Sequence, residues 1–223
     1  PGFGSVAKYV AIATREASLD VASMCETSTK VFVLEVMGRH AGWIAASGAL
    51  AQEKIGDAPH IILFPEVPFV DADFLRTVKR TVNSKGYCVV VVSEGVRRKN
   101  GRFLSESGSK DAFGHAQLGG VAPVIADMIG QKLGYKNHWA VADYLQRAAR
   151  HIASAIDVEQ SYSLGRAAVE LAISGHSGVM PIINRISDSP YRWKIGHEKL
   201  SKVANVERFL PKSFISRDGY GIT

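Results

Sequence analysis

The stretch Val-Phe-Val-Leu-Glu-Val-Met-Gly-Arg-His-Ala-Gly, residues 31–42, decides the fold of this chain. Its first six residues are apolar or β-branched apart from Glu35, which is typical of a strand buried on both faces of a parallel sheet. Gly38 interrupts the run, and residues 42–52 are rich in alanine, which favours a helix. A buried strand that leads into a helix is the unit from which open parallel sheets are built.

The same alternation continues on both sides of this stretch. Short apolar runs predict further strands, and apolar residues at helical spacing predict further helices. The predicted strands are residues 61–64, 88–92 and 179–183. The predicted helices are residues 5–25, 71–85, 121–133 and 157–174. We therefore predict an α/β protein with a parallel, Rossmann-like sheet and helices on both of its faces.

Individual residues indicate where some of these elements begin, end or lie. Asp71 is expected to cap its helix and Gly175 to end the last one. Pro181 cannot donate to a ladder, which predicts an edge strand there. Residues 97–109 are polar and predict a mobile loop, whereas residues 187–223 show no assignable pattern.

Composition narrows the class of protein. The 223 residues are 46% hydrophobic and 22% charged, which is ordinary for a globular chain and excludes disorder. No stretch approaches the roughly 20 consecutive apolar residues of a membrane span. Cys25 and Cys88 lack the spacing of metal ligands and predict reduced thiols, hence a cytoplasmic protein. The chain begins with Pro1 in place of Met and runs at once into a helical pattern, so we expect it to be the interior of a longer protein.

The net charge of +6 could attract either nucleic acid or small anions such as phosphates. The basic residues are scattered, apart from Arg97-Arg98-Lys99, and no aromatic residues interleave them as in nucleic-acid-binding domains. A nucleic-acid-binding domain is therefore the weakest alternative. It would be retained on DNA in a steeply salt-dependent way.

Ligands of open parallel sheets bind at the carboxyl ends of the strands, close to the starts of helices. Three segments fit such positions: Glu35–Arg39, Ser93–Gly95 and Tyr144–Arg147. Arginines bind phosphate in a bidentate fork and a glutamate accepts hydroxyl protons, so together these residues suit a phosphorylated sugar. Taken singly, each has an ordinary alternative: a surface ion pair, a helix cap or a half-buried aromatic ring.

In combination, the three segments resemble the phosphofructokinase family. Residues 35–42 resemble its Met-Gly-Arg substrate motif, residues 92–95 its glutamate strand end, and Tyr144–Arg147 its His/Tyr-x-Gln-Arg motif. The helix expected over 157–171 resembles the helix that follows that motif, and the order of motifs agrees from Gly2 to about Asn184. Residues 114–120 imitate the last motif but lack its arginine.

The resemblance implies a role for each matched residue. Met37, Gly38 and Arg39 would line a fructose 6-phosphate site, with Arg39 also close to the transferring phosphoryl group and acting in catalysis. Glu94 would hold sugar hydroxyls, while Tyr144 and Arg147 would grip the sugar phosphate. The resemblance also implies two regions: residues 1–135 as the remainder of the donor side with part of the sugar-phosphate site, and residues 136–223 as a sugar-phosphate-binding region with a C-terminal tail.

The family also places two arginines from a neighbouring subunit on the sugar phosphate. One corresponding position is Lys30, which keeps the charge but not the fork. The other falls in Lys136-Asn137-His138, where either a lysine or His138 substitutes for the arginine or the contact is lost. The resemblance therefore implies a homodimer or larger assembly.

The family's glycine-rich donor loop and its Thr-Ile-Asp-Asn-Asp motif precede the segment that resembles Gly2-Phe3. We therefore expect a fold incomplete at its N-terminus, Mg²⁺ ligands upstream of this chain, and a segment inactive alone, because phosphoryl transfer depends on that metal and on positioning.

Tyr144 in place of histidine, the inserted-looking region 97–135 and the long tail favour the diphosphate-dependent branch of the family. The expected substrates are fructose 6-phosphate and diphosphate, without nucleic acid or membrane. Two alternatives stay open: an ATP-dependent 6-phosphofructokinase, and a non-catalytic sugar-phosphate-binding subunit.

Overall fold

The structure, a computed structural model, describes residues 2–105 and 120–223. Its main body contains helices α1 (Phe3–Met24), α2 (Trp43–Ala46), α3 (Asp71–Lys85) and α4 (Val121–Leu133), with a 3-10 helix η1 (Ser47–Ala51). Its strands are β1 (Val31–Val36), β2 (Ile61–Leu63), β3 (Cys88–Ser93) and β4 (Asn137–Val141). After β4 come α5 (Leu145–Ala148), the 3-10 helix η2 (Arg150–Ile152), α6 (Ala155–Ile173), β5 (Val179–Asp188), β6 (Tyr191–Lys199), α7 (Leu200–Val203) and the 3-10 helix η3 (Lys212–Phe214).

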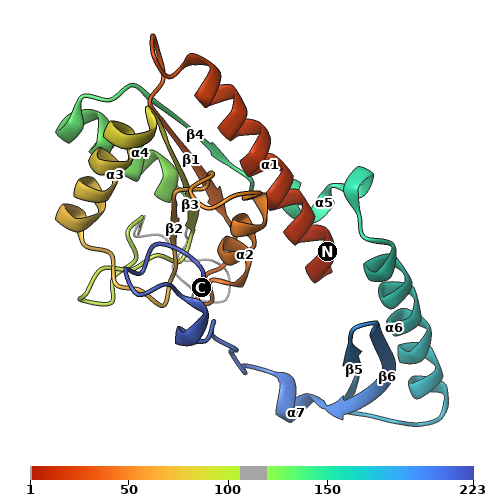
Figure 1. Cartoon of the computed structure of the whole chain (residues 1–223). Helices are drawn as coiled ribbons and strands as arrows, with labels where there is room; N and C mark the ends of the chain where they lie inside the picture. The colour runs from red at the N-terminus through yellow and green to blue at the C-terminus, as the bar shows by residue number, and fades with distance from the viewer. Residues whose placement is uncertain (1, 106–119) are drawn as a thin grey trace.

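The four strands of the main body form one parallel sheet in the order β2-β3-β1-β4 (Figure 1). Alternate residues of each strand point to opposite faces, and each face has its own apolar core. The first core lies against α3 and α4 and includes Val33, Val90 and Ile125. The second lies against α1 and α2 and includes Leu34 and Ile62. This three-layer arrangement confirms the predicted parallel α/β fold with helices on both faces.

A smaller unit, which we call the arm, consists of α6 and the antiparallel hairpin β5–β6, and it projects away from the sheet (Figure 1). The predicted strand at 179–183 exists but continues to Asp188 and pairs with β6. Gly175 follows α6 with φ of 81°, the left-handed backbone that glycine allows, as expected for a helix end.

The last residues of the chain return to the main body. Trp43 Nε1 donates to the carbonyl of Arg208 at 2.8 Å, and Glu66 accepts from the backbone N–H of Leu210, also at 2.8 Å. Leu210 is buried in the second apolar core. The tail, for which the sequence predicts no structure, therefore packs on the carboxyl edge of the sheet.

One local prediction was wrong. Asp71 does not cap α3: Val70 is the N-cap residue, and the Asp71 carboxylate accepts from Arg98 at 2.5 Å instead. Residues 97–105 form no helix or strand, as predicted for a loop, although Leu104 is buried and its N–H donates to the carbonyl of Val96 at 2.9 Å. The imitation motif at 114–119 lies outside the described residues.

Strands β4 and β6 were not predicted. Strand β4 begins just after the predicted boundary between residues 135 and 136 and pairs with β1, so it extends the sheet of the main body. The proposed division into two regions stays a prediction. Within the described ranges, no helix is both long enough and apolar enough to cross a membrane.

Candidate active site at the carboxyl edge of the sheet

The register of the sheet brings the predicted site segments to one edge. Val36 at the end of β1 lies opposite Ser93 at the end of β3, and Glu35 lies opposite Val141 at the end of β4. Because all strands are parallel, the segments that follow them leave from the same edge. The three segments chosen from the sequence are therefore neighbours in space.

The segments after β1 and β3 are in direct contact. The Gly38 N–H donates to Glu94 Oε1 at 3.1 Å, and Ser93 Oγ donates to the Gly38 carbonyl at 2.5 Å. Gly38 has φ of 139°, and a Cβ at Gly95 would lie only 1.9 Å from the Arg39 carbonyl oxygen. Glycine at these two positions lets the two backbones meet, which places Arg39 beside Glu94.

The segment after β4 joins them through the short helix α5. Tyr144 is the N-cap residue of α5, and the Arg147 guanidinium lies 4.4 Å from the centroid of the Tyr144 ring. Both side chains are exposed. Between them in sequence, Gln146 is buried and its Oε1 accepts from the Met37 N–H at 3.2 Å. The sequence places Gln146 in the His/Tyr-x-Gln-Arg motif but indicates no task for it, because its partner Met37 is distant in the sequence.

Two adjoining cavities lie at this edge. The first, of about 160 Å³, is lined by Glu35, Val36, Met37, Glu94, Val141, Asp143 and Gln146. The second, of about 220 Å³, includes Arg147 and Arg150, and Gln146 borders it too. Carboxylates that accept hydroxyl protons thus stand next to arginines that bind phosphate, which is the combination a sugar phosphate requires.

No role was predicted for Glu35 from the sequence, although it is the one charged residue of the otherwise apolar strand β1, and that break in the pattern could have indicated one. Its carboxylate is buried and accepts the backbone N–H groups of Gly120 at 3.2 Å and Ala122 at 2.8 Å. Burial raises the pKa of Glu35, and the nearby charge of Glu94 adds to the rise, while these hydrogen bonds oppose it. Glu35 therefore fixes the start of α4 to β1.

Lys30 and His138 are not brought to this edge. Lys30 directly precedes β1, at the opposite end of the sheet, where its Nζ donates to the carbonyl of Cys25. His138 is exposed on β4, opposite Phe32 near the start of β1. Their expected contribution to a neighbouring subunit's site stays a prediction.

No metal site is formed by the residues that the structure describes. Among them, no group of three or more His, Cys, Asp or Glu side chains is placed to hold an ion. The residues present therefore do not supply a Mg²⁺ site, and no side chain of this chain is assigned to that ion.

The structure is a three-layer α/β fold in which arginines and carboxylates line adjoining cavities at the carboxyl edge of the sheet. The family described as Phosphofructokinase matches residues 1–172. The chain belongs to the phosphofructokinase family.

Close relatives carry a more specific name. The chain is 65% identical over its full length to a pyrophosphate--fructose 6-phosphate 1-phosphotransferase of Methylococcus capsulatus, and 63% identical to one of Halomonas elongata. It also resembles the crystal structure of a pyrophosphate-dependent phosphofructokinase from Marinobacter aquaeolei, with 57% identity, a TM-score of 0.85 and coverage of 100% of this chain and 52% of that one. The chain spans about half the length of the curated relatives, 53% of each.

Proposed function

We propose that the protein encoded by the complete reading frame transfers a phosphoryl group from diphosphate to the 1-hydroxyl of fructose 6-phosphate, giving fructose 1,6-bisphosphate. The observation that carries this proposal is the meeting of three segments at one sheet edge, where Glu94 and Arg147 line adjoining cavities and the backbone of Arg39 lies against Gly95. Relatives more than 60% identical over the whole chain are named for this reaction.

Each matched residue has a physical task in this reaction. Tyr144 and Arg147 hold the 6-phosphate, where the guanidinium supplies charge and paired donors. Glu94 accepts hydrogen bonds from the sugar hydroxyls, and Met37 and Gly38 line the sugar. Arg39 stabilises the negative charge on the migrating phosphoryl group, an electrostatic contribution that counts most where water is excluded.

The donor is tested by assay. Protein from the complete reading frame is supplied with fructose 6-phosphate and either diphosphate or ATP, and fructose 1,6-bisphosphate is measured. Turnover with diphosphate and not with ATP supports the proposal, whereas the reverse makes the protein an ATP-dependent enzyme. Binding of fructose 6-phosphate by calorimetry without turnover would identify a non-catalytic subunit.

The acceptor is tested in the same assay. One relative, 34% identical over 96% of the chain, is named sulfofructose kinase. Sulfofructose is therefore offered as a competing acceptor. A kcat/KM for sulfofructose above that for fructose 6-phosphate would contradict the proposed acceptor.

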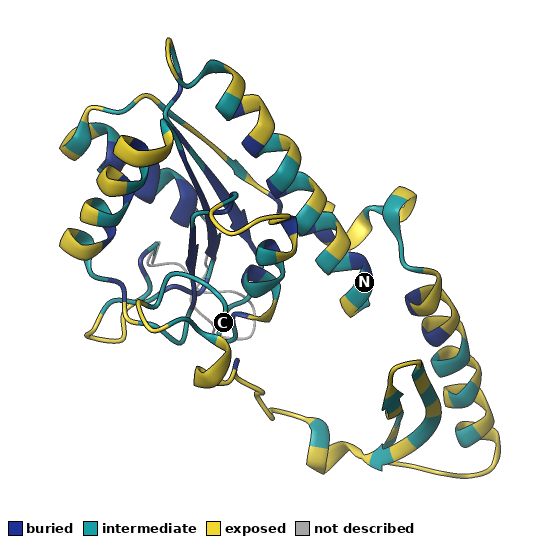
Figure 2. Cartoon of the chain, viewed as in Figure 1, coloured by how far each residue is buried: buried dark blue, intermediate teal, exposed yellow. Residues whose placement is uncertain are grey.

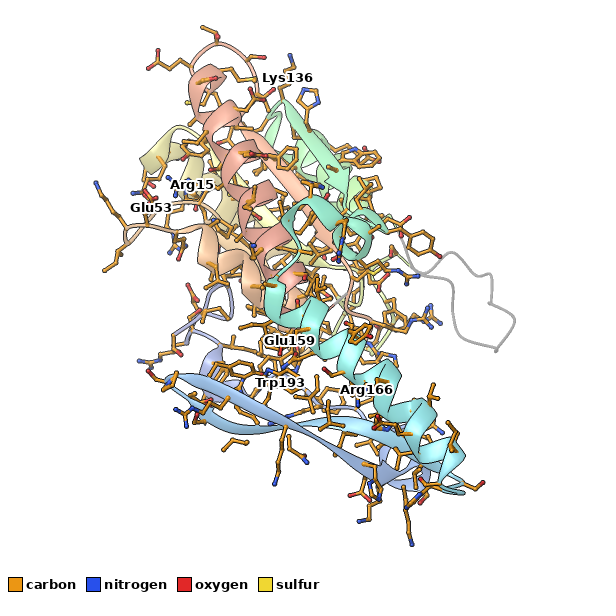
Figure 3. The ribbon with its side chains drawn as sticks, turned by 90° about the vertical axis from the view of Figure 1, so that its right-hand side faces the viewer. Arg15, Glu53, Lys136, Glu159, Arg166 and Trp193 are labelled. Carbon is orange, nitrogen blue, oxygen red and sulfur yellow. The ribbon has the colours of Figure 1, made fainter. Side chains whose placement is uncertain are left out.

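Arg39→Ala tests the site residues. We expect turnover to fall about 10²-fold or more, because a donor aimed at transition-state charge is lost. Arg39→Lys keeps the charge without the fork and should recover only part of that loss. The matched control is Arg166→Ala, since Arg166 lies on the exposed face of α6 in the arm (Figure 3). A twofold or smaller effect of Arg39→Ala would contradict the role given to Arg39.

Mg²⁺, a homodimer or larger assembly and a cytoplasmic location belong to the same proposal and stay predictions. Chelation with EDTA should abolish turnover and added Mg²⁺ should restore it. Sedimentation of the purified protein measures the assembly.

A further inference from the structure

Gln146 is the buried member of an otherwise exposed segment. Its side chain is 2% or less exposed, whereas Tyr144 and Leu145 are 62% and 64% exposed and Arg147 is also exposed. The one-turn helix α5 therefore directs Tyr144 and Arg147 toward solvent and Gln146 toward the interior. A buried amide is retained only when its donor and acceptor are satisfied, so its partners show what it holds.

Both ends of the Gln146 amide bind backbone. Its Oε1 accepts from the Met37 N–H at 3.2 Å, and its Nε2 donates to the Asp143 carbonyl at 2.9 Å. Met37 lies two residues before Arg39, and Asp143 lies directly before Tyr144. One side chain therefore joins two segments that are 109 residues apart in the sequence.

Neither segment can hold its shape by local structure alone. Helix α5 has four residues, far fewer than an isolated helix needs to be stable. Asp143 has φ of 36°, which is unfavourable for a residue with a Cβ. Gly38, on the other segment, is held by Glu94 through the N–H next to the one that Gln146 binds. The relative placement of the two segments thus depends on contacts between them.

We propose that Gln146 is a positioning residue that sets the placement of Arg39 relative to the Tyr144–Arg147 pair. This inference rests on the proposed function, in which these groups hold opposite ends of one sugar phosphate. Both polar ends of the Gln146 amide are bonded to backbone, so Gln146 acts through Met37 and Asp143. A misplacement of about 1 Å can cost about 10²-fold in rate, so a residue that sets this placement controls turnover.

The first test compares two buried glutamines in protein from the complete reading frame. Gln146→Met keeps the volume and removes both hydrogen bonds. Gln160→Met is the control, because Gln160 is 3% exposed on α6 and donates to Tyr191 in the arm. We expect kcat/KM for fructose 6-phosphate to fall about 10²-fold for Gln146→Met, with the KM for diphosphate within twofold. An equal fall in both variants, or in neither, would overturn the proposal.

Gln146→Glu adds a signature that lost stability does not produce. When protonated, a glutamic acid can accept from Met37 and donate to Asp143 as the amide does; when ionised, it repels the Asp143 carbonyl. The groups that face this position across the two cavities are Glu35, Glu94, Asp143, Arg147, Arg150 and Asp157. Burial and the carboxylates raise the pKa of the new side chain and the arginines lower it. We expect its activity relative to wild type to rise as pH falls; a low, constant ratio contradicts the proposal.

Hydrogen exchange separates failure of this inference from failure of the proposed function. Exchange in the peptide spanning residues 34–40 should be at least about 10-fold faster in Gln146→Met than in wild type and unchanged in Gln160→Met, since a protecting bond has been removed. If wild type lacks phosphotransferase activity, the proposed function fails, and this measurement still decides the positioning role. Unchanged exchange in Gln146→Met would overturn it.

Discussion

The sheet body and the arm are ordered by different means. Every residue of β3 is buried, and so are five of the six in β1, whereas no residue of β5 or β6 is buried (Figure 2). The buried residues of α6 are Asp157 and Gln160, both polar. The body is therefore stabilised by apolar burial, while the arm depends on its hairpin ladder and a few polar contacts.

This difference indicates which region carries the proposed site and which region opens more easily. The proposed substrate groups sit on the body, where buried strands hold the segments that carry them. The arm has little apolar surface buried within itself, so it should open at a lower free energy than the sheet. Substitutions in the body should therefore lower the free energy of unfolding more than substitutions in the arm.

Phe74→Ala should have the largest effect on stability. Phe74 is fully buried under the sheet, with its ring centroid 5.2 Å from that of Phe69. Its loss should lower the free energy of unfolding by about 3–5 kcal/mol, measured by urea denaturation. Trp193→Ala is the comparison in the arm, where the half-buried ring faces α6 (Figure 3). It should cost less than half as much, and equal costs would show that the arm has a core comparable to that of the body.

His60 should make the body sensitive to pH. Burial lowers the pKa of His60 to about 4, and the charge of Lys85 contributes to the shift. The unfolded chain, with a pKa near 6.5, binds the proton first, so the free energy of unfolding falls as pH drops from about 6.5 to 4. The loss approaches about 3 kcal/mol.

The control for this effect is His60→Gln. Glutamine can still accept the Val89 N–H that His60 Nδ1 binds at 3.0 Å, but it does not titrate. The raised pKa of Glu35 acts in the opposite direction, because its stabilising contribution is lost as pH rises. The difference between wild type and His60→Gln isolates the histidine. Identical pH dependence in the two proteins would contradict the assignment.

Asp157 connects the two regions, and its removal should cost less than either change above. Its buried carboxylate lies on α6 and accepts the Ser5 N–H at 2.5 Å and the Ser5 hydroxyl at 2.6 Å, at the start of α1. Asp157→Ala should lower the free energy of unfolding by about 2 kcal/mol, as expected for hydrogen bonds to a charged group. The exposed Asp127 on α4 provides the control, and Asp127→Ala should stay within about 0.5 kcal/mol of wild type.

The sequence predicted the body much better than the arm, and the physical reason is burial on two faces. Strands β1 and β3 lie between two helical layers, so their apolar runs are continuous and easy to recognise. Strand β4 is an edge strand with exposed residues such as Trp139, and its pattern is mixed. Strand β6 does alternate, with Tyr191, Trp193 and Ile195 on its less exposed side, and this period of two could have revealed it.

The sequence also revealed the task of some site residues and not of others. Arg39, Glu94 and Arg147 could be selected because charged residues at strand ends have a chemical meaning in an open sheet. Gln146 belongs to the matched motif, but its task could not be predicted, because only the folded chain brings Met37, 109 residues away, to it. The task of a residue that positions others depends on distant partners, whereas the task of a residue that meets a ligand often follows from its own chemistry.

Arg166→Ala should have the smallest effect and thereby sharpen the contrast. Arg166 Nε donates to Glu170 Oε1 at 2.8 Å one turn along α6, but the two side chains are 73% and 61% exposed. An exposed pair of this spacing contributes about 0.3–0.5 kcal/mol, and less in high salt. Urea denaturation at low and high NaCl measures it, and turnover should stay within twofold of wild type. A loss above about 1 kcal/mol would mean that this face of α6 is covered in solution. The arm would then be stabilised by burial, as the body is.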